Sequence, residues 1–241
     1  MSNRWSYDLL AEPWILTGES TRLAPRVLAR YGFGLFDRGA TVIYGTSVDG
    51  LHDLTFHEPD LAVNWLAEQG GLLPIWHLGE PEFDATIRYA DVREAMGRPA
   101  AEKPLRHLGL GLTAGYFRPP GPREQIANIM RRAFIDLISA ESPPFAYVYD
   151  EEILEAVPDV LAVVEQHYAA IADLRPSPMV SWLNYFSPSY ATALGIERLR
   201  QIDRLTEEAG GYVWQLTEYP WELTHAQLDV ARRLWATLLS V

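Results

Sequence analysis

The stretch from Met179 to Glu218, MVSWLNYFSPSYATALGIERLRQIDRLTEEAGGYVWQLTE, decides how the chain folds. Its first part is β-branched and aromatic and lies between Pro178 and Pro188, which predicts a buried strand. Pro188 suits the first turn of a helix, and Gly210-Gly211 predicts a turn into a second strand. The stretch therefore predicts strand, helix, turn and strand, and it contains no obvious catalytic residue.

Helices and strands are predicted to interleave on the N-terminal side of this stretch as well. The expected strands are 5–10, 41–44, 72–78, 83–89, 108–117 and 145–149, and the expected helices are 21–31, 59–68, 123–140 and 158–174, with one more at the C-terminus. This pattern predicts an α+β fold of mixed β-sheets covered by helices.

Residues 95–107, AMGRPAAEKPLRH, contain two prolines and one glycine and show little periodicity, so they are the predicted linker. They separate an N-terminal α/β half, residues 1–94, from a C-terminal α/β half, residues 108–241. Each half is expected to be sandwich-like, and the two share one extended sheet or two abutting sheets.

The chain is acidic, with a net charge of −12 over 241 residues, and it has no cysteine. The missing cysteines exclude disulfides, thiolate metal sites and a cysteine nucleophile. Between Arg132 and Arg175 there is no Lys or Arg, whereas nine Asp and Glu residues fall inside. Such a charge repels nucleic acid and favours a basic partner, although a solvated surface that keeps the protein soluble explains it equally.

The first residues, MSNRWSYDLL, lack the basic and apolar segments of a signal peptide. No stretch approaches the roughly 18 consecutive apolar residues of a spanning helix. A cytoplasmic protein without a membrane partner is therefore expected.

Two short motifs resemble ligand-binding motifs, but a structural explanation fits each of them better. Gly109 to Ala114 spells Gly-x-Gly-x-x-Ala, but the following residues, GYFRPP, cannot continue as the helix that a dinucleotide site needs, so a strand with closely packed glycines is predicted. His52 and His57 are five residues apart and would not share a helix face. We expect no cofactor and no metal.

An acid/base site is the enzymatic alternative. Glu80, Glu82 and Asp84 alternate along a predicted strand near His77, and residues two apart on a strand point the same way. A solvated strand face explains the same pattern. No nucleophile elbow, phosphate loop or zinc-protease motif occurs in the chain, so no enzymatic activity is predicted.

The order SWLNYFSPSYATALG, GGYVWQLTE, a polar break and a closing helix resembles the C-terminal part of the immunity protein 52 family of bacterial polymorphic-toxin systems. The similarity covers roughly the last quarter of the chain. The resemblance implies a cytoplasmic immunity protein that binds one cognate toxin and blocks it without catalysis or cofactor. It implies a nuclease as the target and a setting such as type VI secretion.

The toxin-binding residues are predicted from charge, because a nuclease must present basic groups to phosphate. The predicted contacts form two patches: Asp150, Glu151, Glu152, Glu155 and Asp159, and a second patch of Glu207, Glu208 and Glu218. Charge complementarity at a helix start explains the first patch equally. Aromatic side chains that could anchor an interface or fill the core are Tyr147, Tyr149, Tyr185, Tyr190, Trp214, Tyr219 and Trp221. An acidic adaptor without a toxin is a third possibility, and the sequence makes no prediction of oligomeric state.

Overall fold

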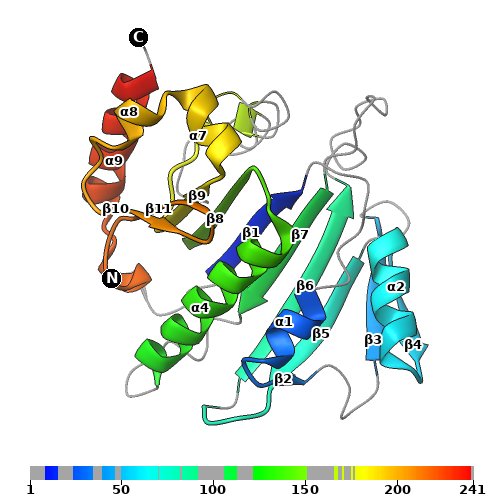
Figure 1. Cartoon of the computed structure of the whole chain (residues 1–241). Helices are drawn as coiled ribbons and strands as arrows, with labels where there is room; N and C mark the ends of the chain where they lie inside the picture. The colour runs from blue at the N-terminus through cyan, green and yellow to red at the C-terminus, as the bar shows by residue number, and fades with distance from the viewer. Residues whose placement is uncertain are drawn as a thin grey trace.

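The computed structural model describes residues 9–15, 24–34, 40–46, 50–69, 71–81, 83–91, 106–112, 122–150, 166, 167, 170, 175 and 177–239. Within these ranges the chain forms a long antiparallel sheet with helices packed against it (Figure 1). The α+β class expected from the sequence is confirmed.

Eleven strands form one sheet in the order β10-β11-β9-β8-β1-β7-β6-β5-β3-β4, with β2 beside β5. Their bounds are β1 (Leu9–Ile15), β2 (Phe33–Gly34), β3 (Ala40–Thr46), β4 (Gly50–Phe56), β5 (Gly71–His77), β6 (Phe83–Asp91), β7 (Arg106–Leu112), β8 (Phe145–Asp150), β9 (Leu183–Phe186), β10 (Leu205–Glu208) and β11 (Gly211–Gln215).

The expectation of mixed sheets is wrong, because every pairing among the described strands is antiparallel. The helix α4 (Arg123–Glu141) connects β7 to β8, and these two strands run in the same direction, but β1 lies between them and pairs with both. In the same way β3 lies between β4 and β5, which α2 (Pro59–Gln69) connects. An inserted antiparallel strand thus separates the strands that a crossover would otherwise pair in parallel.

Strands of both predicted halves belong to this sheet. The strand β6 pairs with β7 from Ala85 opposite Leu112 to Asp91 opposite Arg106, and β1 pairs with β7 and β8. The predicted linker falls on residues 95–105, which lie outside the described residues, and on Arg106 and His107, which belong to β7. The division into two halves stays a prediction.

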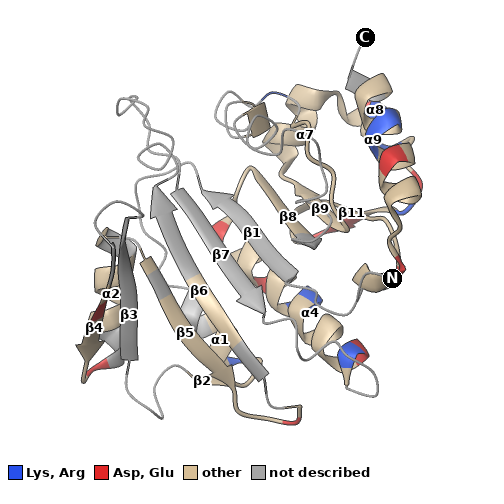
Figure 2. Cartoon of the chain, turned by 180° about the vertical axis from the view of Figure 1, so that it is seen from behind, with Lys and Arg blue, Asp and Glu red and all other residues tan. Residues whose placement is uncertain are grey.

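Helices cover the sheet on one face along its middle and on both faces at one end. In Figures 1 and 2, α1 (Ala24–Ala29), α2 and α4 lie on the same face. At the β9–β11 end, α7 (Pro188–Leu194) and α9 (His225–Leu239) pack against the opposite face, where Trp235 of α9 contacts Phe186 and Trp214. The short α8 (Ile196–Leu199) follows α7, and the predicted helix 158–174 falls mostly outside the described residues.

The helix α4 packs its apolar side against the sheet as its sequence predicts. Its buried residues recur every three or four positions, which places them on one face of a helix: Ile126, Ala127, Met130, Ala133, Phe134, Leu137 and Ile138. The helix ends at Ser142, which adopts a left-handed conformation and donates its backbone N–H to the carbonyl of Ile138. The predicted helix 123–140 is confirmed, one residue longer.

The strand β9 lies in the most aromatic part of the core, and all four of its residues are buried. The ring of Phe186 lies 5.6 Å from Phe145, 6.3 Å from Tyr190 and 5.1 Å from Trp235, measured between ring centroids. Burying one such ring contributes about 1.5–3 kcal/mol. Aromatic packing around Phe186 therefore ties β9 to β8, α7 and α9.

Ser187 and Gly195 delimit α7. The Ser187 hydroxyl accepts a hydrogen bond from the Tyr190 amide at 3.2 Å, and Pro188 occupies the first turn. Gly195 ends the helix with a φ of +87°, a conformation that favours glycine. The predicted strand, helix and final strand of residues 179–218 correspond to β9, α7 and β11, but Gly195 ends the predicted helix before Leu199, which belongs to α8, and the strand β10 was not predicted.

Tyr190 makes the free energy of unfolding fall at alkaline pH. Its hydroxyl is buried, donates to the carbonyl of Arg175 at 2.6 Å and accepts from the amide of Ser177 at 3.1 Å. Burial raises the pKa of Tyr190 above its ordinary value. The unfolded chain therefore loses this proton at about pH 10 while the folded chain keeps it, so stability is fully present below that pH and falls as pH rises.

We expect Tyr190→Phe to lose about 1–2 kcal/mol at pH 7, because two hydrogen bonds are removed. Between about pH 9.5 and pH 11 the variant should lose less further stability than the wild type, since it has one phenol fewer to ionise. Urea midpoints across this range measure both effects. Parallel curves for the two proteins would show that Tyr190 does not set the alkaline limit.

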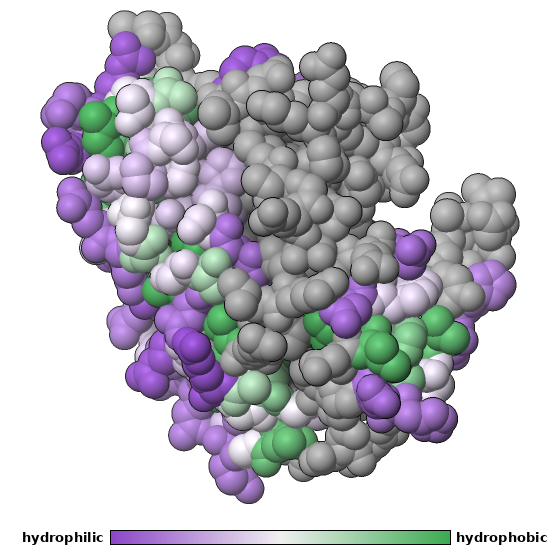
Figure 3. Space-filling model, turned by 45° about the vertical axis from the view of Figure 1, so that its right-hand side comes forward, coloured by the Kyte–Doolittle hydropathy of each residue, from purple (hydrophilic) through white to green (hydrophobic). Residues whose placement is uncertain are grey.

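The exposed apolar surface is scattered. Among the described residues, the exposed large hydrophobic side chains are Leu61, Leu78, Val230 and Leu234. On the face shown in Figure 3, coloured hydrophobic residues form small groups between hydrophilic ones. No helix in the described ranges combines the length and apolar composition needed to cross a bilayer.

Candidate partner-binding surface

The first predicted acidic patch lies almost entirely outside the described residues. Asp150 ends β8, where it pairs with Leu9 of β1. Glu151, Glu152, Glu155 and Asp159 are outside the described ranges. Asp150 thus lies at a strand end, as its sequence context predicts, and contact of this patch with a toxin stays a prediction.

Glu207 and Glu208 belong to β10, the edge strand, and point to opposite faces of the sheet. A carboxylate oxygen of Glu207 lies 3.7 Å from the guanidinium of Arg200, which also contacts Glu197 at 3.1 Å. Glu208 instead faces α4, where its carboxylate binds Arg131. The sequence grouped the two residues, but the strand separates them.

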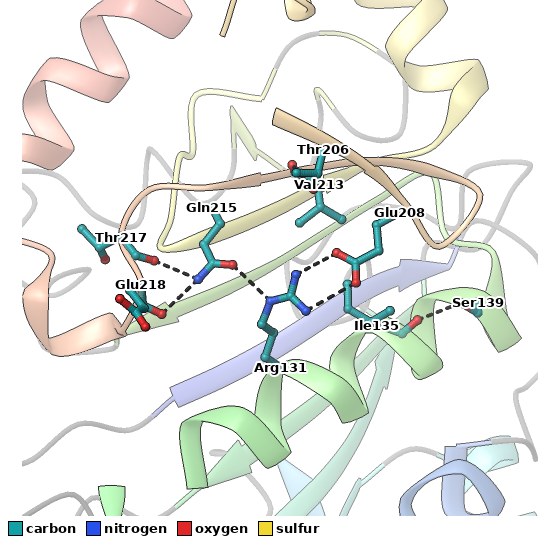
Figure 4. A network of polar contacts seen from close by, with 9 residues as sticks. All are labelled: Arg131, Ile135, Ser139, Thr206, Glu208, Val213, Gln215, Thr217 and Glu218. Carbon is teal, nitrogen blue, oxygen red and sulfur yellow. Dashed lines mark hydrogen bonds and ion pairs between the residues drawn. The ribbon is translucent and has the colours of Figure 1, made fainter. Parts of the chain in front are cut away.

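Arg131 connects α4 to the end of the sheet through a network that Figure 4 shows. Its guanidinium donates to the two carboxylate oxygens of Glu208 at 2.7 and 3.4 Å and to the side-chain oxygen of Gln215 at 3.1 Å. The amide nitrogen of Gln215 in turn donates to the carbonyls of Thr217 and Glu218 at 2.9 and 3.0 Å. We call these contacts the Arg131 network, and they fix the backbone that leaves β11.

A double-mutant cycle on Arg131 and Glu208 should give a coupling energy of about 1 kcal/mol. Both side chains are about 30% exposed, so solvent screens the pair only in part. The variants are Arg131→Met, Glu208→Gln and their combination, compared in urea unfolding. The matched cycle on Arg200 and Glu207, which are 52% and 71% exposed, should give less than about 0.3 kcal/mol. Equal coupling in the two cycles would contradict a structural role for the Arg131 network.

Glu218 begins a short segment with two stacked aromatic rings. Tyr219 and Trp221 lie with their ring centroids 4.8 Å apart and their planes 6° from parallel. Pro220 to Glu222 form a 3-10 turn, η2 (Pro220–Glu222), and the Glu222 carboxylate accepts a hydrogen bond from the Tyr219 amide at 3.1 Å. Tyr219 and Trp221 are both partly exposed.

The start of α4 lies beside these rings. The guanidinium carbon of Arg123 lies 4.7 Å from the centre of the Trp221 ring. Partial burial raises the pKa of the Tyr219 hydroxyl, the charges of Glu124 and Glu218 raise it further, and a hydrogen bond with Asn128 lowers it. The charge of Glu124 thus acts on Tyr219 although the two residues are far apart in the sequence, whereas Glu218 directly precedes Tyr219.

Glu124 and Glu218 differ from Glu207 and Glu208 in their ion pairing. Both are exposed, and in the described part of the chain neither forms an ion pair with an arginine. Of the predicted contact residues that the structure describes with their side chains, Glu218 is therefore the one whose charge stays available to a partner. We call Glu124, Glu218, Tyr219, Trp221 and Glu222 the aromatic–acidic surface.

The predicted aromatic anchors fall into two groups. Tyr147, Tyr185, Tyr190 and Trp214 are buried and belong to the core, whereas Tyr219 and Trp221 are partly exposed. The side chain of Tyr149 lies outside the described residues. The charge-based reasoning missed Glu124, because nothing in the sequence indicates that the start of α4 lies beside the exit of β11.

The residues of the enzymatic alternative lie around the β5–β6 hairpin. His77 is buried, and its Nδ1 lies 2.6 Å from the carbonyl oxygen of Pro81. A carbonyl only accepts, so Nδ1 donates and the ring closes the hairpin. Glu80 is exposed, whereas Glu82 and the side chain of Asp84 are outside the described residues. An acid/base site here stays a prediction.

The glycine motif lies on a strand, and so does His52 of the histidine pair, whereas His57 follows the end of β4. Gly109 and Gly111 belong to β7, which confirms the predicted strand. His52 and Asp53 are successive exposed residues of the edge strand β4. Within the described ranges, no group of three or more His, Cys, Asp or Glu side chains is placed to hold a metal ion.

The single antiparallel sheet with helices on both faces at one end defines an α+β protein with an aromatic–acidic surface. No protein-family model and no curated protein matches the chain. Its fold is similar to that of a solved structure from Pseudomonas aeruginosa, described as a T6SS (type VI secretion system) protein. The TM-score is 0.51 at 14% sequence identity, over 97% of this chain and 73% of that chain. At this identity the likeness shows a shared fold alone.

Proposed function

We propose that the protein is a cytoplasmic immunity protein that binds a cognate basic toxin and neutralises it by covering its active site. The observation that supports this most is the exposed negative charge of Glu124 and Glu218, which acts on the partly exposed Tyr219 and forms no ion pair in the described part of the chain. Interfaces that hold a partner tightly combine Tyr and Trp anchors with complementary charge. The protein acts by binding and needs no cofactor.

Two further observations support the proposal. The chain resembles the immunity protein 52 family in residues 181–195 and 210–218, and its fold is similar to that of a T6SS protein. Its net charge of −12 favours a basic partner. A nuclease is the proposed target, since its phosphate-binding cleft must be basic and an acidic protein can compete for it.

Co-expression with the product of the adjacent reading frame tests the proposal. We expect that product alone to stop growth, and co-expression of this protein to restore survival and to give a complex that co-purifies. Toxicity that this protein does not relieve would contradict the proposal.

The same assay separates the first predicted patch from the aromatic–acidic surface. The triple variant Glu151→Arg, Glu152→Arg and Glu155→Arg reverses the first patch, and the double variant Glu124→Arg and Glu218→Arg reverses charge on the aromatic–acidic surface. We expect the double variant to lose protection, because it places two positive charges against a basic partner. Full protection by the double variant would remove this surface as the contact.

A further inference from the structure

We propose that the aromatic–acidic surface docks an arginine side chain of the toxin, which stacks on the Tyr219–Trp221 pair between Glu124 and Glu218. The inference rests on the proposed function and names the contact that the function uses. It assigns a recognition role to Tyr219 and Trp221.

The surface already binds a guanidinium group from its own chain. The guanidinium carbon of Arg123 lies 4.7 Å from the centre of the Trp221 ring, within the range of a cation–π contact. Tyr219 stacks on Trp221 at 4.8 Å, so Arg123 and Tyr219 both lie against the Trp221 ring. A planar guanidinium stacks on such rings better than a lysine ammonium does, which selects arginine as the occupant.

The local charge is complementary to a cation. Glu124, Glu218 and Glu222 are exposed and negative, and Arg123 is the one positive side chain among these residues. Two negative charges therefore remain in excess at the platform. A stacked arginine of the toxin would reduce this excess and donate charge-assisted hydrogen bonds to the carboxylates.

The surface is held in place before a partner binds. The Arg131 network fixes the carbonyls of Thr217 and Glu218, and the Glu222 carboxylate fixes the Tyr219 amide. Asn128 hydrogen bonds the Tyr219 side chain from α4. Little conformational entropy then remains to be lost on binding, which favours affinity.

Nona-arginine and nona-lysine peptides, titrated calorimetrically into the purified full chain at low salt, test this inference. The main variant is Glu124→Gln with Glu218→Gln. The matched control is Glu197→Gln with Glu207→Gln, which changes the net charge equally near Arg200. We expect the main variant to weaken nona-arginine binding about fivefold or more, and the control less than about twofold.

Trp221→Leu gives an independent readout, because it removes the ring and keeps the charges. It should weaken nona-arginine binding more than nona-lysine binding, with the fold checked by circular dichroism. Equal weakening by the two double-glutamine variants, or no binding of nona-arginine by the wild type, would overturn the inference. Failure of the proposed function is a separate result: the wild-type protein would not relieve toxicity on co-expression.

Discussion

Replacing Trp235 by alanine is expected to lower the free energy of unfolding by about 4 kcal/mol. The indole is 2% exposed, stacks on Phe186 at 5.1 Å and contacts Trp214 at 6.0 Å. Its Nε1–H also donates to the carbonyl of Ser177 at 2.7 Å. The substitution therefore opens a large cavity and leaves a buried carbonyl without this donor, and both changes destabilise the folded state.

The neighbouring residue provides the control for this prediction. Leu234 precedes Trp235 on α9 and is 41% exposed, so Leu234→Ala should change stability by less than about 0.5 kcal/mol. Urea unfolding of the two variants and the wild type measures the difference. Similar midpoints for the two variants would mean that α9 does not pack through Trp235.

Gly211→Ala is expected to cost about 2–3 kcal/mol, because β11 passes very close to β9 at this position. A Cβ atom added at Gly211 would lie 2.5 Å from the carbonyl oxygen of Phe186 and 2.7 Å from the Tyr185 hydroxyl. The Phe186 carbonyl belongs to the backbone, so the strand pairing itself must shift. The cost should appear as a lower urea midpoint.

Gly210→Ala is the matched control, because its expected loss of stability comes from backbone strain and not from a close contact. An added Cβ at Gly210 meets nothing within 4 Å, but its φ is +72°, so Gly210→Ala should cost about 1 kcal/mol from backbone strain alone. A larger loss at Gly210 than at Gly211 would contradict the close approach of β11 to β9.

Local sequence patterns predicted the elements that depend on local chemistry. Pro188 in the first turn of α7 and the turn at Gly210-Gly211 each determine a neighbouring element, and the structure confirms those elements. The edge strand β4 was missed, because Gly50 to Phe56 contains His52 and Asp53, which look like ligands more than like strand residues. As an edge strand it tolerates these polar residues on its exposed positions.

The order of the strands in the sheet could not be predicted from the sequence, because it depends on which strands far away in the chain insert between others. Alternating helices and strands favour parallel neighbours, but β1, β3 and β11 each lie between two strands that helices connect, and each pairs with them in antiparallel fashion. The residues of the candidate surface could not be predicted from the sequence either. Charge alone grouped Glu207 with Glu208, whereas strand alternation separates them and the fold brings Glu124 to Tyr219.

Inhibition of the toxin by this protein in solution directly tests the proposed neutralisation. The product of the adjacent reading frame would be purified and its DNA cleavage followed while the wild-type protein is added. We expect cleavage to stop at one equivalent of this protein, because each molecule covers one active site, and the Glu124→Arg, Glu218→Arg variant should require a large excess. Undiminished cleavage in a tenfold molar excess of the wild-type protein would contradict the proposal that it neutralises a nuclease by occlusion.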